Sequence, residues 1–225
     1  MNGINYNSPE ALRPLTAYIM NTLRILKGKN PGDNYYDEYL KHYAREGDKF
    51  YDQYHFAIQW VLNNHPKRIL EIGVRTGLSI CNMLSAYIDY SSIESIRLVD
   101  IWSDGYASPE IVKMNMRAMN FPKRVMDLTE FIVGSSLEEI PKYDSAVNYY
   151  DYILVDGDHA KKAAAQDLKN VVRLCAPGGV IVFDDISEHG CNLLDVWEAF
   201  KTAHYHLFDF DMNLNGKGTA WAVKK

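Results

Sequence analysis

From Lys67 to the C-terminus, short apolar runs alternate with longer segments whose apolar residues recur at helical intervals. The apolar runs occupy residues 68–73, 95–101, 130–134, 150–157 and 178–185. The segments with helical periodicity occupy residues 76–88, 108–120, 136–140, 160–175 and 191–203. Such alternation is typical of repeated β-α units, which build a parallel sheet with helices on both faces.

The last 21 residues break this alternation. Residues 205–210 and 219–225 each predict a strand, and the loop between them contains Asn and Gly. Two strands joined in this way form an antiparallel hairpin. The pattern therefore predicts an α/β fold with a Rossmann-like, doubly wound, mostly parallel seven-stranded sheet that ends in a C-terminal antiparallel hairpin.

Residues 1–66 carry a different pattern, with apolar and aromatic residues at helical spacing over 9–28 and 36–64. The segment 28–34, with sequence GKNPGDN, predicts a turn between them. We divide the chain into an N-terminal helical extension (1–66) and a main domain (67–225). Helices added before such a sheet serve as a lid or as a contact in a homo-oligomer. Most tyrosines of the extension are expected in the core, because aromatic residues at helical spacing are usually buried.

Composition narrows the functional classes. The 225-residue chain has a formal net charge of -5 and contains no run of Lys and Arg, so nucleic acid is a poor candidate partner. No apolar stretch reaches the roughly 18 residues that span a bilayer, and the first residues lack a leader pattern. We expect a soluble, cytoplasmic protein without a membrane partner. The three cysteines lack CxxC spacing and indicate neither a disulfide framework nor a zinc site.

Ligands of doubly wound sheets bind outside the carboxyl ends of the strands. The first predicted strand is followed by a glycine pair, Gly73 and Gly77, in a GxxxG spacing. These glycines let the backbone approach a ligand at the start of a helix. Dinucleotides are typically bound by the tighter GxGxxG form. Glu71, just before the pair, suits a ligand with positive charge and makes a nicotinamide cofactor less plausible.

Polar residues also follow the second and third predicted strands. Asp100 ends the second strand, where a carboxylate can accept hydrogen bonds from both hydroxyls of a ribose. Ile101 and Trp102 come next and are placed to lie against an adenine. The small residues after the third strand, expected near the adenine edge, are Gly134, Ser135 and Ser136.

Three carboxylates, Asp156, Asp184 and Asp185, end the fourth and fifth predicted strands. Neighbouring strand ends would bring their oxygens together in a pocket suited to a hard cation such as Mg²⁺. A cation there could hold two substrate oxygens and acidify one of them. The alternative is structural, with Asp184 capping the following helix and Asp158 competing with Asp156.

Together these segments resemble the ordered motifs of class I S-adenosylmethionine (SAM)-dependent methyltransferases, over about residues 67–225. The motifs read ILEIGVRTG, IRLVDIW, FIVGSS, YILVDGDH and LCAPGGVIVFDD. VDGDH, followed by a helix and PGGVIVFDD, is similar to the metal-dependent O-methyltransferases of sugar hydroxyls on macrolide and aminocoumarin antibiotics. This is the macrocin and mycinamicin O-methyltransferase group, with its cephalosporin hydroxylase-like relatives.

The resemblance implies a role for each matched residue. It places the methionine moiety of SAM near Glu71 and Gly73, the ribose on Asp100, and the adenine near Trp102 and Ser135. It places Mg²⁺ on Asp156, Asp184 and Asp185, with His159 as the base that takes the acceptor's hydroxyl proton. The full cofactor set is Glu71, Gly73, Arg75, Gly77, Ser79, Asp100, Ile101, Trp102, Gly134, Ser135, Ser136 and Asp156. Gly134-Ser135-Ser136 stands where the family more often has an acidic residue, and the N-terminal helices match no known segment.

Three functions remain open. The first is methyl transfer from SAM to a small hydroxylated acceptor, such as a sugar, assisted by a divalent metal. The second is metal-independent transfer by the same fold, with Asp158 or His159 acting alone. The third is a SAM-binding protein without transfer activity. A nicotinamide-dependent oxidoreductase is a more distant fourth.

Overall fold

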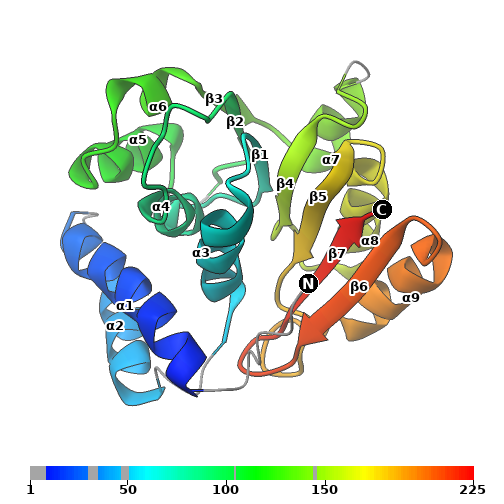
Figure 1. Cartoon of the computed structure of the whole chain (residues 1–225), viewed down its shortest axis with the longest axis horizontal. Helices are drawn as coiled ribbons and strands as arrows, with labels where there is room; N and C mark the ends of the chain where they lie inside the picture. The colour runs from blue at the N-terminus through cyan, green and yellow to red at the C-terminus, as the bar shows by residue number, and fades with distance from the viewer. Residues whose placement is uncertain (1–8, 30–34, 47–50, 104, 144–145) are drawn as a thin grey trace.

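A computed structural model describes residues 9–29, 35–46, 51–103, 105–143 and 146–225. Its centre is a seven-stranded sheet with the order β3-β2-β1-β4-β5-β7-β6 (Figure 1). The strands are β1 (Arg68–Ile72), β2 (Ser95–Asp100), β3 (Thr129–Val133), β4 (Tyr150–Val155), β5 (Cys175–Phe183), β6 (Phe208–Asn213) and β7 (Thr219–Lys224). The first five pair in parallel, and β7 pairs antiparallel with both β5 and β6. The predicted doubly wound sheet with its terminal hairpin is confirmed.

Helices cover both faces of this sheet. They are α1 (Pro9–Leu26), α2 (Tyr35–Glu46), α3 (Gln53–Asn64), α4 (Leu78–Ser85), α5 (Pro109–Ala118), α6 (Lys123–Asp127), α7 (Ser136–Glu139), α8 (Lys161–Val171) and α9 (Leu194–His204), with a 3₁₀ turn η1 (Ile140–Lys142). Ile69 packs into one buried cluster and its neighbour Leu70 into another. Because successive side chains of a strand point to opposite faces, these clusters are the two layers of core.

The N-terminal helices are part of the core on one face. Leu12, Ile19 and Leu23 of α1 are buried in the same cluster as Ile69 of β1 and Trp221 of β7. Figure 1 shows α1 and α2 side by side, next to α3 and α4. Tyr36, Tyr43, Tyr51 and Tyr54 are all buried, as predicted for most tyrosines of this segment.

Three predicted boundaries are wrong. The strand predicted over residues 205–210 lies three residues later, as β6 (Phe208–Asn213). Residues 36–64 do not form one helical stretch, because α3 begins anew at Gln53 with Asp52 as its N-cap. The helix predicted to reach Cys175 ends at Val171, and Cys175 already belongs to β5. A register irregularity between Tyr150 and Tyr152 of β4 lets β5 pair on both sides of its Pro-Gly-Gly segment. Helix α6 was not predicted, and residues 30–34 of the predicted turn lie outside the described residues.

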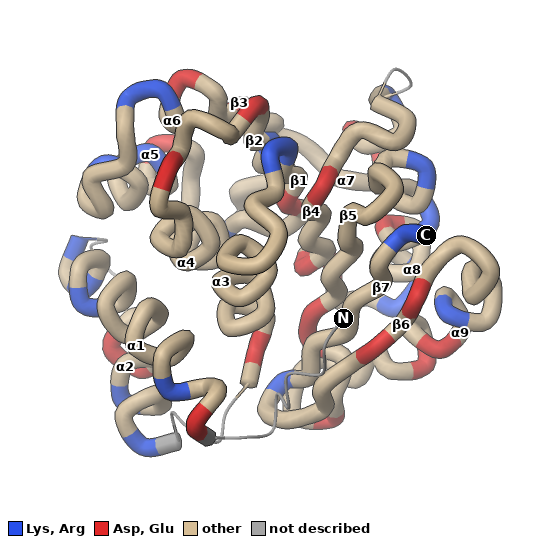
Figure 2. The backbone as a smooth tube through the Cα atoms, in the orientation of Figure 1, with Lys and Arg blue, Asp and Glu red and all other residues tan. Residues whose placement is uncertain are grey.

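Charge is mixed along the chain. Figure 2 shows Lys and Arg interspersed with Asp and Glu over the described backbone. Within the same residues, no helix has the length and apolar character needed to cross a membrane.

Candidate active site

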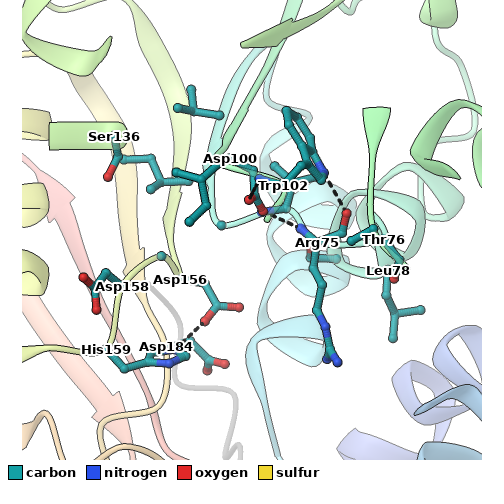
Figure 3. Close-up of a pocket in the computed structure, with 18 of the residues that line it drawn as sticks. Arg75, Thr76, Leu78, Asp100, Trp102, Ser136, Asp156, Asp158, His159 and Asp184 are labelled. Carbon is teal, nitrogen blue, oxygen red and sulfur yellow. Dashed lines mark hydrogen bonds and ion pairs between the residues drawn. The ribbon is translucent and has the colours of Figure 1, made fainter. Parts of the chain in front are cut away.

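A cavity of about 710 Å³ opens at the carboxyl ends of the parallel strands. It lies where the strand order reverses between β1 and β4, the point at which open α/β sheets bind ligands. Asp100, Trp102 and Arg75 lie on one side, and Asp156, Asp184 and His159 lie on the other (Figure 3). The predicted residues of the two halves therefore share one cavity.

The loop after β1 depends on glycine at two positions. Gly73 has φ +85°, and a Cβ there would lie 1.8 Å from the carbonyl oxygen of Asp156. Gly77 has φ +79°, and a Cβ there would lie 2.7 Å from a methyl group of Val112. The first glycine allows the ends of β1 and β4 to approach, and the second seats the start of α4. Gly73 lines the cavity, whereas Gly77 is not among its lining residues.

Asp100 anchors this loop. Its Oδ2 accepts hydrogen bonds from the backbone N–H groups of Val74 (2.8 Å) and Arg75 (2.7 Å). Its Oδ1 accepts one from the backbone N–H of Trp102 (2.7 Å). A carboxylate oxygen has two lone-pair sites, so Oδ2 is fully used, whereas Oδ1 retains capacity for one ligand hydroxyl. Asp100 therefore positions the loops after β1 and β2 and also lines the cavity.

The Trp102 ring is held in place at the cavity wall. Its indole N–H donates to the carbonyl oxygen of Arg75 (2.9 Å). The Arg75 guanidinium donates to the hydroxyl of Tyr106 and lies 5.0 Å from that ring's centroid. Beside Trp102, Ile101 lines the cavity with 58% of its surface exposed. This wall offers aromatic and aliphatic surface that a flat ligand can cover.

The loop after β3 lies opposite that wall. Gly134, Ser135 and Ser136 all line the cavity, as the sequence predicts. The Ser136 hydroxyl donates to Asp167 (3.0 Å), so it is already engaged inside the protein. A Cβ on Gly134 would lie 2.9 Å from the side chain of Glu139, which would have to shift to admit it.

Glu71 occupies a different place from the one expected. It is 2% exposed and is absent from the cavity lining, whereas Ser79, which donates a hydrogen bond to it, lines the cavity. Burial raises the pKa of Glu71 to about 8, and the Ser79 hydrogen bond opposes this rise. Glu71 thus lies beneath the cofactor half of the cavity and reaches it through Ser79.

The free energy of unfolding of Glu71→Gln should rise relative to that of wild type as the pH increases, because wild type loses stability that the variant keeps. Between pH 4.5 and about 8 the unfolded chain releases the Glu71 proton while the folded chain retains it. The free energy of unfolding of wild type therefore loses up to about 1.4 kcal/mol per pH unit from this group. Urea unfolding of both proteins from pH 5 to 8.5 measures the difference.

The matched control is Glu188→Gln, which removes an exposed carboxylate from a loop. The difference in the free energy of unfolding between this control and wild type should not grow with pH in the same way. If the corresponding difference for Glu71→Gln stays constant from pH 5 to 8.5, Glu71 is not buried in its protonated state.

The acidic half of the cavity brings three carboxylates together. Asp156, Asp184 and Asp185 each place an oxygen within 4.8 Å of the others. Burial raises the pKa values of Asp156 and Asp184, and the neighbouring carboxylates raise them further. Thr219 donates to Oδ1 of Asp184 (2.9 Å), whereas Oδ1 of Asp185 is buried without a hydrogen bond.

His159 lies at the edge of this acidic group. Its Nε2 is 3.4 Å from Oδ1 of Asp156 and 3.3 Å from Oδ2 of Asp185. The hydrogen bond to Asp156 raises the pKa of His159. Asp158 is exposed, and its Oδ1 accepts from the backbone N–H of Ala160 (2.8 Å), so it braces the turn before α8.

Several lining residues were not predicted. Tyr39, Gln53 and Tyr54 come from the N-terminal helices, and Lys217 comes from the hairpin loop. The Gln53 amide donates to Oδ2 of Asp156 (2.7 Å), and its own oxygen is buried without a hydrogen bond. Lys217 Nζ lies 3.4 Å from Oδ1 of Asp185. Their distance in sequence from the strand ends left no local pattern to identify them.

Solved structures with the same fold include several methyltransferases. An O-methyltransferase of Bacillus cereus in complex with S-adenosylhomocysteine (SAH) matches with 18% identity and a TM-score of 0.58, covering 94% of this chain and all of the other. The SAH-bound methyltransferase of Podospora anserina matches with 17% identity and a TM-score of 0.57, covering 100% of this chain and 98% of the other. A Corynebacterium glutamicum protein matches with 13% identity and a TM-score of 0.60, covering 88% and 93%. At these identities the likeness concerns the fold.

No curated protein matches the sequence significantly. A family model described as a methyltransferase domain matches residues 70–186, more than half of the chain. The matched segment runs from β1 to the residue after Asp185 and contains the loops that build most of the cavity. The chain therefore belongs to this methyltransferase domain family.

Proposed function

We propose that this chain transfers a methyl group from SAM to a hydroxyl oxygen of a small acceptor, with the assistance of a divalent metal ion. The observation that carries the proposal is the single cavity at the strand-order switch. One half of this cavity has the carboxylate and aromatic groups that a nucleoside needs, and the other half has three clustered carboxylates. Transfer requires the two substrates to lie next to each other, which one continuous cavity permits.

The cofactor half fits SAM. Oδ1 of Asp100 retains acceptor capacity for one ribose hydroxyl, and the fixed Trp102 ring offers a face for adenine. The exposed side chain of Ile101 would be covered by the purine. The SAH-bound proteins of Bacillus cereus and Podospora anserina share this fold, which supports the same cofactor.

The acidic half fits a hard cation. Its donors are carboxylate oxygens, which Mg²⁺ and similar ions prefer. Oδ1 of Asp185 lacks a hydrogen bond, and the carboxylates raise one another's pKa values because they repel. Asp156, Asp184 and Asp185 would hold the ion. An ion so placed supplies positive charge that lowers the pKa of an acceptor hydroxyl.

His159 is the residue that handles the acceptor proton. Its Nε2 faces both Asp156 and Asp185 at the cavity edge, where it can accept the proton of a bound hydroxyl. The oxygen then forms a bond to the methyl carbon of SAM as the carbon–sulfur bond breaks, and the bonding pair stays on sulfur. The products are a methyl ether, SAH and protonated His159.

The acceptor half suits a small ring with several hydroxyls, such as a sugar. Tyr39 and Tyr54 line it, with their ring centroids 6.2 Å apart, and provide aromatic surface. The free oxygen of Gln53 and the ammonium of Lys217 provide polar groups beside the carboxylates. A small-molecule acceptor, a homo-oligomer and a cytoplasmic location remain predictions.

Removing the metal with EDTA should lower the rate of methyl transfer by about 10²-fold or more, since such an ion contributes several kcal/mol of transition-state stabilisation. The assay follows labelled methyl groups from SAM onto a panel of sugars and other small hydroxylated compounds. Asp184→Asn should lower the rate similarly while SAH binding persists.

Glu188→Gln, which removes a carboxylate outside the cavity, is the matched control and should keep its dependence on Mg²⁺. Transfer that is insensitive both to EDTA and to Asp184→Asn would favour the metal-independent alternative. Tight SAH binding with no transfer to any acceptor would favour a binding protein.

A further inference from the structure

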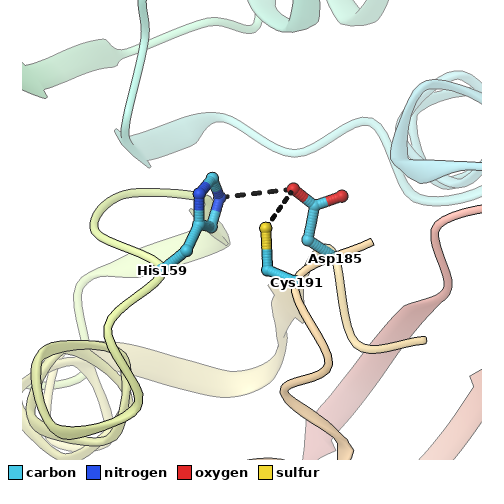
Figure 4. Close-up of side chains that lie close together, drawn as sticks. All are labelled: His159, Asp185 and Cys191. Carbon is cyan, nitrogen blue, oxygen red and sulfur yellow. Dashed lines mark hydrogen bonds and ion pairs between the residues drawn. The ribbon is translucent and has the colours of Figure 1, made fainter. Parts of the chain in front are cut away.

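A second set of ligating groups lies next to the carboxylates and includes a cysteine. His159, Asp185 and Cys191 each place a ligand atom within 4.8 Å of the others. Figure 4 shows the imidazole and the thiol reaching the same carboxylate. Nε2 of His159 is 3.3 Å from Oδ2 of Asp185, and Sγ of Cys191 is 3.4 Å from that oxygen.

The two separations from the shared oxygen match two edges of a small tetrahedron. Zinc binds nitrogen and oxygen at about 2.0 Å and sulfur at about 2.3 Å. With tetrahedral angles, these bond lengths place a nitrogen about 3.3 Å and a sulfur about 3.5 Å from a shared oxygen ligand. The nitrogen and the sulfur thus already stand at the expected distances from Oδ2 of Asp185, and they lie within 4.8 Å of each other.

The loop after β5 holds Cys191 in this position. The backbone N–H of Cys191 donates to the carbonyl oxygen of Asp185 (2.9 Å), which closes the loop on itself. The backbone N–H of Ser187 donates to the carbonyl oxygen of Lys217 (2.8 Å), which ties the loop to the hairpin. A Cβ on Gly190 would lie 2.6 Å from that same Lys217 oxygen, so glycine permits the close approach.

A second observation also points to a cation. Asp185 is 3% exposed, and its Oδ1 is buried without a hydrogen bond, with the Lys217 ammonium at 3.4 Å. A buried carboxylate gains from positive charge at each oxygen. Lys217 supplies it at Oδ1, and an ion held with His159 and Cys191 would supply it at Oδ2. Cys191 is half-buried and forms no disulfide, and His159 and Asp185 line the cavity.

We propose that His159, Asp185 and Cys191 form a second site, for a borderline divalent ion such as Zn²⁺, which shares Asp185 with the neighbouring oxygen-only carboxylate group. One nitrogen, one oxygen and one sulfur donor favour Zn²⁺ or Co²⁺ over Mg²⁺, which binds oxygen. Three protein ligands leave a fourth position for water. The Cys191 thiol releases its proton to solvent when the ion binds.

Occupation of this site would have a consequence for catalysis. Zinc on Nε2 of His159 takes the lone pair that would accept the acceptor proton, and it engages Asp185 as well. Zinc therefore inhibits methyl transfer at concentrations at which Mg²⁺ supports it. This consequence rests on the proposed function, whereas the site itself does not.

Co²⁺ binding tests the site directly, because a cobalt–thiolate bond gives a near-ultraviolet charge-transfer absorption that oxygen and nitrogen ligands do not give. The wild-type protein should develop this absorption with one equivalent of Co²⁺, lose it on addition of Zn²⁺, and retain it in excess Mg²⁺. Cys191→Ser should abolish the absorption and weaken Zn²⁺ binding by about 10-fold to 100-fold. Asp184→Asn, which alters the oxygen group without touching His159 or Cys191, should keep the absorption.

Alkylation provides a test without substitution. Iodoacetamide should modify Cys191 rather than the buried Cys81 and Cys175, and Zn²⁺ should protect it. Absence of the absorption in the folded wild type, its persistence in Cys191→Ser, or its loss in Asp184→Asn would overturn the three-residue site. Unprotected Cys191 in the presence of Zn²⁺ would do the same. Loss of Mg²⁺ dependence in the transfer assay would instead count against the proposed function alone.

Discussion

The Gly73→Ala variant should lose SAH binding and unfold at much lower urea than wild type. The added Cβ would lie 1.8 Å from the carbonyl oxygen of Asp156, and backbone must move to admit it. The positive φ of +85° adds strain of its own. We expect the free energy of unfolding to fall by more than about 4 kcal/mol, the range reserved for severe disruption. Urea unfolding and calorimetric titration with SAH measure the two effects.

Gly178→Ala is the matched control. Gly178 has a similar φ of +76°, but a Cβ there would have no atom within 4 Å. It should therefore show the backbone strain without the clash, retain SAH binding, and lose about 1–2 kcal/mol in the free energy of unfolding. If the losses in Gly73→Ala and Gly178→Ala differ by less than about 1 kcal/mol, the contact between β1 and β4 is not the reason for glycine at position 73.

His159→Gln should lower the rate of methyl transfer at neutral pH by about 10²-fold to 10⁴-fold, the usual contribution of a general base. SAH binding should remain, because the cofactor groups lie on the other side of the cavity. The wild-type rate should fall as the pH is lowered and His159 becomes protonated. The variant should lack this fall, so a pH profile distinguishes proton transfer from a structural effect.

His189→Gln is the corresponding control, because His189 is an exposed loop residue outside the cavity lining. It should keep both the rate and the pH profile of wild type. A His159→Gln variant with the wild-type rate and profile would remove His159 as the base. Asp156 or an acceptor hydroxyl that ionises without a base would then be considered.

The central strands β1, β4 and β5 were predictable because their apolar runs are largely buried on both faces, which leaves a strong local signal. In β1, Leu70 and Ile72 face one core layer and Ile69 faces the other. The start of β5 was not predictable, because its Pro-Gly-Gly segment imitates the end of a helix. Pairing of Cys175 with Tyr150 of β4 determines that boundary, and such pairing is not local.

The carboxylates of the site were predictable for a related reason. Parallel strands all present their carboxyl ends at one edge, so Asp156 and Asp184 had to lie close together once the strands were placed. Glu71 was harder, since its side chain shares a strand face with Ile69 and points into the core beneath the cavity. Gln53 and Cys191 lie on a distant helix and a loop, where only the tertiary fold brings them to the site.

The most direct test of SAM dependence is calorimetric titration of the wild-type chain and Asp100→Ala with SAH, with and without Mg²⁺. We expect one SAH bound per wild-type chain, and an affinity at least about tenfold lower in Asp100→Ala, where the carboxylate's hydrogen bonds are lost. Absence of binding by folded wild-type protein, with or without Mg²⁺, would contradict the assignment of SAM as the methyl donor.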